Sequence, residues 1–152
     1  MINIAVLTPA RDEEENIPKL YSSLTNIEGC KIYWLIIENG SSDNTLEVCK
    51  RFLDTKNLSI SLVSYPNMES YSVGRSLSKY LSDGLKLIIK SGQDFKYLSI
   101  LDADVIIPSN YYIKIFHEMN QNKNLMLTSG KGVMDGFSDG EGELHVRGNA
   151  RV

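Results

Sequence analysis

Short apolar runs alternate with longer amphipathic segments along most of this chain. Continuous or alternating apolar residues predict strands, whereas apolar residues spaced three or four positions apart predict helices. Strands are predicted at 2–8, 32–37, 58–64, 95–101 and 125–128. Helices are predicted at about 16–27, 43–53, 72–90 and 110–120.

Polar and aromatic residues refine this pattern. Asn16 is a candidate N-cap, because Pro18 is well suited to the first turn that would follow it. Asp43, which follows the turn Gly-Ser-Ser, is expected to cap the next helix. Trp34 lies inside an apolar run and is predicted to be a core residue, whereas His117 is predicted at the surface.

The alternation of strands and helices predicts an α/β fold, with a mostly parallel sheet and helices on both faces. Residues 1–130 are expected to form this domain. The pattern changes from Gly130, because six glycines and several acidic residues occupy 130–148 without periodicity. We therefore expect 131–152 to be a glycine-rich loop and the start of a truncated segment.

Composition excludes several classes of protein. The net charge is −3 and the pI about 5.4, which argues against non-specific nucleic-acid binding. The only two cysteines, Cys30 and Cys49, suit a reducing compartment. No apolar run approaches the roughly 20 residues that a transmembrane helix needs, and no signal peptide is apparent. The expected location is the cytoplasm.

Asp102 and Asp104 directly follow the apolar run 95–101. Burying a carboxylate is costly unless it is paired, hydrogen-bonded or bound to a metal, so this strand is expected to end where a cation can be met. Two more polar clusters, 8–16 and 38–43, follow the first and second predicted strands. Because the carboxyl ends of parallel strands meet at one edge, we expect the three clusters to converge there.

These clusters carry a family resemblance. Pro9-Ala-Arg-Asp-Glu-Glu-Glu-Asn16, Glu38-Asn-Gly-Ser-Ser-Asp-Asn-Thr45 and Asp102-Ala-Asp104 resemble, in this order, the PAxNEExN, DDGSxDxT and DxD motifs of family 2 glycosyltransferases. The resemblance covers essentially the whole chain. It implies a Rossmann-like GT-A nucleotide-diphospho-sugar transferase fold.

The resemblance also implies a nucleotide site. Pro9, Ala10 and Arg11 would lie beside the nucleoside, and Glu13 would approach its base or ribose. Asn39 stands where the family usually has an aspartate that binds the base. An amide both donates and accepts hydrogen bonds, whereas a carboxylate only accepts, so this departure leaves the preferred base open.

For the diphosphate, the resemblance implies a divalent cation. Asp102, followed by Ala103, would contact ribose or metal, and Asp104 would bind Mg²⁺ or Mn²⁺. Such an ion neutralises the leaving nucleoside diphosphate. Arg75 or Lys79 would add positive charge near the phosphates.

The implied reaction moves a sugar from a nucleoside-diphosphate sugar, such as a UDP- or GDP-sugar, to an unknown acceptor. Lipid-linked molecules and polysaccharides are both candidate acceptors, and peripheral attachment at the inner membrane face is an alternative location. Transfer with inversion needs a carboxylate that deprotonates the acceptor, and no motif identifies it. Asp135 as that base and His145 as a further metal ligand are minor alternatives.

Other functions remain open. The chain could be a non-catalytic nucleotide-sugar-binding module or an accessory subunit that lacks a complete acceptor site. A phosphatase or phosphotransferase with a DxD nucleophile is disfavoured, because only 48 residues follow Asp104. A sugar nucleotidyltransferase would need a glycine-rich first loop, and 9–16 contains no glycine.

Overall fold

The computed structural model describes residues 1–66, 73–122, 124–128, 133–134, 137–138 and 150–151, with the side chains of 73–76 and of 133–151 excepted. The strands are β1 (Ile2–Ala10), β2 (Cys30–Asn39), β3 (Ser59–Tyr65), β4 (Tyr97–Leu101), β5 (Val133–Met134), β6 (Phe137–Ser138) and β7 (Ala150–Arg151). The helices are α1 (Ile17–Thr25), α2 (Thr45–Phe52), α3 (Val73–Lys90) and α4 (Tyr111–Gln121).

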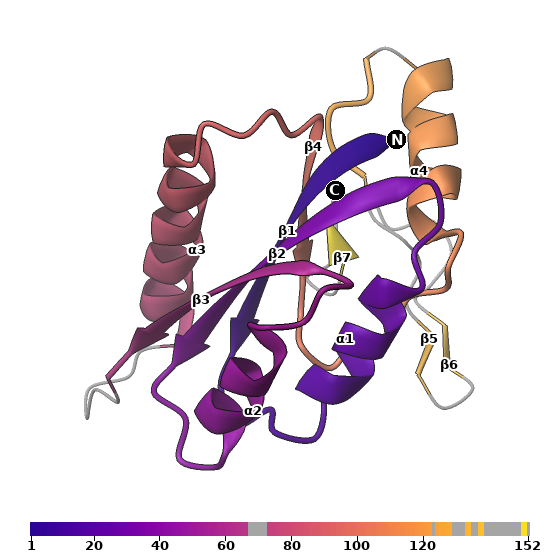
Figure 1. The fold of residues 1–152 in the computed structure, drawn as a ribbon. Coiled ribbons are helices and arrows are strands. Elements are labelled where there is room, and N and C mark those ends of the chain that lie inside the picture. Colours follow the sequence, from indigo (N-terminus) through magenta and orange to yellow (C-terminus); the bar gives the residue numbers. More distant parts are fainter. Residues whose placement is uncertain (67–72, 123, 129–132, 135–136, 139–149, 152) are drawn as a thin grey trace.

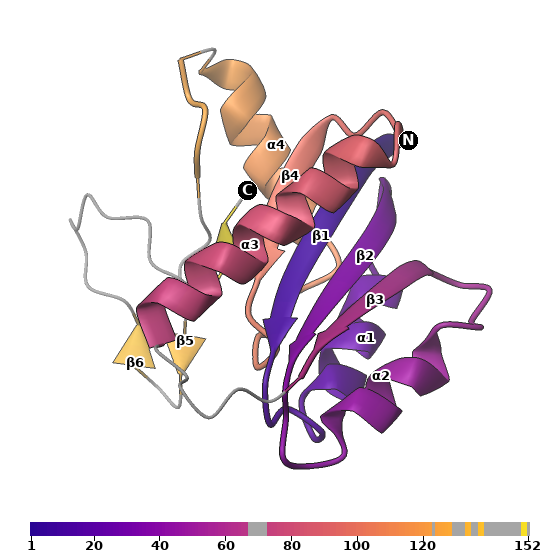
Figure 2. The ribbon, with the colours of Figure 1, turned by 90° about the vertical axis from the view of Figure 1, so that its left-hand side faces the viewer.

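The main sheet has the strand order β3-β2-β1-β4-β7 (Figure 1). Strands β1 to β4 are parallel to their neighbours, and β7 pairs with β4 in the antiparallel direction. Strands β5 and β6 form a separate two-stranded sheet. Helix α3 covers one face of the main sheet, and α1, α2 and α4 cover the other (Figure 2). The predicted α/β fold is confirmed.

Side chains that alternate along each strand build two separate cores. On β1, Ile4 and Val6 pack in the core beneath α1, α2 and α4, whereas Ala5 and Leu7 pack in the core beneath α3. Because both faces are covered, the central strands are almost wholly apolar, as parallel sheets require. The coverage of both faces explains the unbroken apolar runs in the sequence.

Gly84 lies on the side of α3 that faces the sheet, against Leu7 and Ile37. A Cβ atom placed there would lie 2.6 Å from Ile37 Cδ1 and 2.7 Å from Leu7 Cδ1. Only the absence of a side chain allows the helix backbone to rest on these two buried side chains at this distance.

The opposite core contains polar atoms that are paired. Trp34 is completely buried and its indole Nε1 donates a hydrogen bond to Thr8 Oγ1 at 2.9 Å. The buried hydroxyl of Tyr112 on α4 donates to Ser99 Oγ on β4 at 2.9 Å. The prediction that Trp34 is a core residue is confirmed, as is the exposure of His117.

One expectation is wrong, and another is confirmed only in part. Residues 125–128 form no strand, and Met126 is 89% exposed, so this apolar run is not buried in a sheet. The strand that pairs with the outer side of β4 is β7 instead. Asn16 does precede α1, but its side chain caps no backbone N–H of that helix. Its amide nitrogen donates to Glu13 Oε2 instead, at 2.7 Å.

Apart from the short strands β5, β6 and β7, the predicted glycine-rich region 131–152 lies outside the described residues. The division of the chain at residue 130 therefore stays a prediction. Within the described part of the chain, no helix combines the length and apolar character needed to cross a bilayer.

Candidate functional site

The three polar clusters follow β1, β2 and β4, which are neighbours in the sheet. All three strands run in the same direction, so their carboxyl ends form one edge, marked by the arrowheads in Figure 2. This is the edge of an open α/β sheet at which ligands bind. The predicted convergence of the clusters at one edge is therefore found in the structure.

The pleat of the strands divides the clusters between the two faces. Asn39 follows Leu35 and Ile37, which pack beneath α3, so it belongs to the same face. By the same alternation, Pro9 follows Leu7 on this face. Leu98 of β4 also packs beneath α3, but β4 ends at Leu101, so the alternation does not extend to Asp102. Two residues predicted for the nucleotide site, Pro9 and Asn39, thus share the α3 face.

Ala10 and Ala103 belong to the opposite face, where both are buried in the core beneath α1, α2 and α4. Their contribution to a nucleotide site is therefore limited to their backbone. Small side chains at these two positions fit the packing of that core.

Glu38 also lies on the opposite face and is only 2% exposed. Its Oε1 accepts a hydrogen bond from the backbone N–H of Ser41 at 2.6 Å, and its Oε2 accepts from Ser64 Oγ at 2.5 Å. The carboxylate therefore fixes the turn after β2 and ties it to β3. Sequence reasoning missed this role, for which the only signal was an acid at the end of an apolar run.

Two loops are joined by reciprocal hydrogen bonds that we call the interloop clasp. Asp12 Oδ1 accepts from the backbone N–H and the hydroxyl of Ser42, at 2.6 and 2.9 Å, and the Asp12 N–H donates to Ser41 Oγ. Glu14 Oε2 accepts from the backbone N–H and the amide of Asn44, at 2.9 and 2.8 Å. The acidic residues after β1 thus hold the loop after β2.

Asp43 and Thr45 complete the clasp. Asp43 Oδ2 accepts from the Glu14 N–H at 3.1 Å, and Thr45 Oγ1 accepts from the Glu13 N–H at 2.7 Å. Asp43 Oδ1 also accepts from the Thr45 N–H at 2.9 Å, but the N-cap residue of α2 is Asn44, so the prediction that Asp43 caps this helix is wrong. Helix α2 itself begins at Thr45, one residue later than a cap at Asp43 would give.

The clasp lowers the pKa of two carboxyl groups. The hydrogen bonds from the backbone and side chain of Ser42 lower the pKa of Asp12 below its ordinary value. Burial alone would raise the pKa of Asp43, but hydrogen bonds from Thr45 and from the Glu14 N–H outweigh it and lower the pKa. Both acids are therefore carboxylates at neutral pH.

The other predicted residues are distributed around this edge. Arg11 is half-buried, with its Nε 3.8 Å from Asp12 Oδ2. Arg75 lies near the start of α3, which begins at the same edge of the sheet (Figure 2), and its side chain lies outside the described residues. Lys79, one turn further along α3, is exposed. Asp135 and His145 also lie outside the described residues.

Asp102 is half-buried and Asp104 is exposed, directly after β4. No group of three or more His, Cys, Asp or Glu residues that could hold a metal occurs within the described residues. Two carboxylates suit a hard cation such as Mg²⁺, which is commonly held by one or two carboxylates together with substrate phosphates. The donor set therefore fits an ion that binds with a diphosphate.

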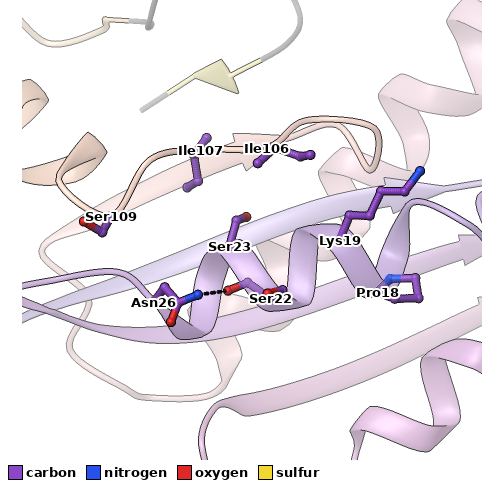
Figure 3. A pocket seen from close by; sticks show the side chains of 8 residues that line it. All are labelled: Pro18, Lys19, Ser22, Ser23, Asn26, Ile106, Ile107 and Ser109. Carbon is purple, nitrogen blue, oxygen red and sulfur yellow. Dashed lines mark hydrogen bonds between the residues drawn. The ribbon is translucent and has the colours of Figure 1, made fainter.

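Two cavities lie away from the clustered motifs. The larger, of about 590 Å³, lies between α1 and the segment after Asp104, as Figure 3 shows. The smaller, of about 430 Å³, lies at the amino ends of β2 and β3. Neither is lined by a residue predicted for the nucleotide site.

Comparison with known proteins decides the family. The sequence profile of the family described as "Glycosyl transferase family 2" matches residues 5–143. The chain belongs to glycosyl transferase family 2. A similar protein, 4,4'-diaponeurosporenoate glycosyltransferase of Staphylococcus haemolyticus, is 25% identical over 171 aligned residues, which are 99% of this chain and 44% of that protein.

A second similar protein is the poly-beta-1,6-N-acetyl-D-glucosamine synthase of Staphylococcus epidermidis. It is 27% identical over 127 residues, which are 84% of this chain and 28% of the synthase. The family 2 chain described here therefore spans less than half the length of either relative.

Solved structures confirm the GT-A fold. TarS of S. aureus (residues 1–349) superposes with a TM-score of 0.60 at 17% identity, over 80% of this family 2 chain and 33% of TarS. The mannosyltransferase PcManGT of Pyrobaculum calidifontis, solved with GDP-Man and Mn²⁺, gives a TM-score of 0.58 at 15% identity, over 76% of this chain and 32% of PcManGT.

Proposed function

We propose that this chain binds the nucleoside diphosphate of a sugar donor and serves the transfer of that sugar to an acceptor hydroxyl. The observation that carries the proposal is that the three polar clusters follow β1, β2 and β4, which are parallel neighbours in the sheet. Membership of glycosyl transferase family 2 supports it. TarS has been solved with UDP-GlcNAc and PcManGT with GDP-Man and Mn²⁺, so donors of either kind are candidates.

In this proposal, β1 and β2 bind the nucleoside. Pro9, Ala10 and Arg11 line it, and Asn39 meets the base. Glu13 is a further candidate for a base or ribose contact, although its carboxylate already accepts from Asn16. The interloop clasp fixes these segments relative to one another, so the site is preorganised before the donor arrives.

Asp102 and Asp104 hold a Mg²⁺ or Mn²⁺ ion together with the diphosphate, and the backbone of Ala103 joins them. Such an ion would neutralise negative charge on the leaving nucleoside diphosphate. Arg75 is proposed to add a positive charge, because it lies near the start of α3 at the same edge.

The proposed transfer exchanges one bond at the anomeric carbon of the sugar for another. The acceptor oxygen bonds to the anomeric carbon, the bond from that carbon to the diphosphate oxygen breaks, and the acceptor proton passes to a base. No base is assigned among the described residues. A polysaccharide or a lipid-linked molecule is the proposed acceptor, met in the cytoplasm or at the inner face of the membrane.

A thermal-shift titration tests donor binding. UDP, GDP, CDP and dTDP are each added with and without Mn²⁺ or Mg²⁺. A nucleotide at 100 times its dissociation constant stabilises the fold by about 2.7 kcal/mol. We expect at least one nucleotide to raise the melting temperature only when the metal is present. The absence of any shift under all conditions would contradict the proposal.

The second candidate is a donor-binding module that transfers nothing by itself. Release of UDP from UDP-GlcNAc, or of GDP from GDP-Man, separates the two functions. Metal-dependent binding without release supports the module, whereas release on the time scale of minutes supports the transferase.

A further inference from the structure

The carboxylate of Glu38 is buried inside the protein, on the side of the sheet that α2 covers. Glu38 is 2% exposed, and its charge is one of the causes that raise the pKa of Cys49, a buried residue of α2. Asn39, the next residue, belongs to the opposite face, beneath α3. Burying a carboxylate is costly unless hydrogen bonds compensate for the lost water. The groups that satisfy its two oxygens therefore show what Glu38 holds in place.

The two oxygens of Glu38 bind two different segments of the chain. Oε2 accepts from the hydroxyl of Ser64 at 2.5 Å, and Ser64 is the register partner of Glu38 on β3. Oε1 accepts from the backbone N–H of Ser41, in the turn after β2, at 2.6 Å. Hydrogen bonds this short are typical of an ionised acceptor. The carboxylate thus connects the turn after β2 to a strand of the sheet.

Ser41 extends this connection to the loop after β1. Its Oγ accepts a hydrogen bond from the backbone N–H of Asp12 at 3.1 Å. Asp12 has a positive φ of 56° and directly follows Arg11. We call the series of hydrogen bonds that joins Ser64, Glu38, Ser41 and Asp12 the Glu38 relay. The relay runs from β3, through β2, to a loop that is proposed to line the nucleoside.

The Glu38 relay and the interloop clasp have different effects. The clasp joins the loop after β1 to the loop after β2, so it fixes the two loops relative to each other. The relay ends on Glu38 and Ser64, which are residues of β2 and β3, so it fixes the joined loops relative to the sheet. A binding site is held more precisely when its loops are supported by strands. Loss of the relay would leave the clasp intact and still let both loops shift together.

We infer that Glu38 is a positioning residue of the donor site, which strengthens binding of the nucleoside through Ser41 and Asp12 without touching the donor. This inference rests on the proposed function, since it concerns the same donor.

The inference separates the two halves of the donor. The relay joins β3, β2 and the loop after β1, whereas the proposed metal ligands Asp102 and Asp104 follow β4. A shift of the loop after β1 should therefore weaken contacts with the nucleoside and leave the binding of metal and diphosphate unchanged. Glu38 should accordingly affect a nucleoside diphosphate more than it affects inorganic pyrophosphate.

The test measures the affinities for a nucleoside diphosphate and for pyrophosphate by titration calorimetry with Mn²⁺ present. The nucleotide is whichever of UDP, GDP, CDP and dTDP raises the melting temperature of the wild type most. In Glu38→Ala we expect the nucleotide to bind at least about tenfold more weakly, and pyrophosphate to stay within about threefold of the wild type. Equal weakening of both ligands would show a general defect and overturn the inference.

Two further variants separate positioning from stability. In Glu38→Gln, the amide oxygen can accept from the Ser41 N–H and the amide nitrogen can donate to Ser64 Oγ. This variant should bind the nucleotide within about threefold of the wild type, and a loss as large as that of Glu38→Ala would overturn positioning by these hydrogen bonds.

Tyr112→Phe is the matched control, because it removes the buried hydrogen bond from Tyr112 to Ser99 beneath α4. It should melt at a lower temperature than the wild type and bind both ligands with wild-type affinity. If it weakened the nucleotide as much as Glu38→Ala does, lost stability would explain the effect and the inference would be overturned.

Ser41→Ala tests the relay where Glu38→Ala folds poorly. It removes the acceptor of the Asp12 N–H and keeps the backbone N–H that binds Glu38. We expect the nucleotide to bind about fivefold more weakly, with pyrophosphate unchanged. Glu38→Ala/Ser41→Ala should bind the nucleotide about as weakly as Glu38→Ala alone, because both changes break one relay. Losses that multiply in the double variant would overturn the relay.

The remaining outcomes distinguish the inference from the proposed function. Unchanged nucleotide affinity in Glu38→Ala, or in Ser41→Ala where Glu38→Ala does not fold, overturns the inference and leaves the proposed function intact. Failure of every nucleotide and of pyrophosphate to bind the wild type overturns the proposed function and the inference together.

Discussion

Asp12 Oδ1 accepts two hydrogen bonds from Ser42, one from the backbone N–H at 2.6 Å and one from the hydroxyl at 2.9 Å. The two residues are thirty positions apart and belong to different loops. Asp12 also has a positive φ of 56°, a conformation that aspartate and asparagine tolerate better than most residues. An aspartate therefore suits this position for two reasons. Its carboxylate accepts these hydrogen bonds, and its backbone tolerates the positive φ.

Replacing Asp12 should therefore loosen the interloop clasp. We expect Asp12→Ala to lower the free energy of unfolding by about 1 kcal/mol, at the low end for a charged acceptor because the carboxylate is exposed. Asp12→Asn keeps an acceptor and the positive φ and should lose less. Urea unfolding of the three proteins checks this, and an equal loss in both variants would contradict the role of the acceptor.

The lowered pKa values of Asp12 and Asp43 predict a dependence of stability on pH. Both carboxyl groups have an ordinary pKa of 3.8, and the folded chain holds them below it. Their contribution is complete above that value and is lost as the pH falls through the lower folded pKa values. Urea unfolding should show a smaller acid-induced loss between about pH 4 and about pH 2 in Asp12→Asn/Asp43→Asn than in the wild type. If the free energy of unfolding fell equally with pH in the variant and the wild type, Asp12 and Asp43 would not be the cause of the loss.

Close packing at Gly84 predicts a cost for any side chain there. Overpacking costs about 1–3 kcal/mol, whereas alanine gains about 1 kcal/mol over glycine in a helix. We therefore expect Gly84→Ala to lower the free energy of unfolding by on the order of 1 kcal/mol. Adding Ile37→Val removes one of the two contacted methyl groups. The double variant should lose less than the sum of the single variants, and strict additivity would contradict direct contact.

Asp104 is predicted to affect ligand binding without affecting the fold. It is exposed, and its side chain makes no hydrogen bond or ion pair with a described residue. Asp104→Asn should therefore melt at the wild-type temperature yet bind UDP at least tenfold more weakly when Mn²⁺ is present, a loss of about 1.4 kcal/mol. Asp54→Asn, an exposed acid in the turn after α2, is the matched control. Chelation of the metal should reduce wild-type affinity to that of Asp104→Asn, and unchanged affinity in this variant would exclude the metal role.

The two thiols should differ in reactivity. Burial, together with the charges of Glu38 and Asp43, raises the pKa of Cys49 to about 12. Burial also raises the pKa of Cys30, which is only half-buried. Because the thiolate is the reactive form, a disulfide reagent should modify Cys30 slowly and leave Cys49 unmodified in the folded chain. Cys30→Ser should therefore react only after urea unfolds it, and rapid reaction without urea would contradict this.

Periodicity was sufficient to place the main elements, because the central strands β1 and β2 are buried on both faces. The run at 32–37 illustrates this, since β2 extends only two residues beyond it at each end. The same rule failed at 125–128, because a short apolar run does not reveal whether another element covers it. The pairing of β7 with β4 was not predictable either, since it joins residues about fifty positions apart.

At the candidate site, sequence patterns identified which residues gather at the edge but not what each one contacts. The sequence identifies Asp12 and Glu14 only as acidic residues of a loop. Their hydrogen-bond partners, Ser42 and Asn44, lie in another loop. Such long-range hydrogen bonds leave no periodic signal. The register of β2 with β3, which brings Tyr65 beside Asn39, is equally invisible in a single sequence.

Glu38 and Asn39 are consecutive residues that point to opposite sides of the same sheet. One anchors a turn against β3, and the other faces the edge where a ligand would enter. A substitution at Asn39 therefore leaves the hydrogen bonds of Glu38 to the turn and to β3 in place. The end of β2 is for this reason a place where ligand preference can be engineered without rebuilding the scaffold, provided that substitutions replace residues and do not insert or delete them.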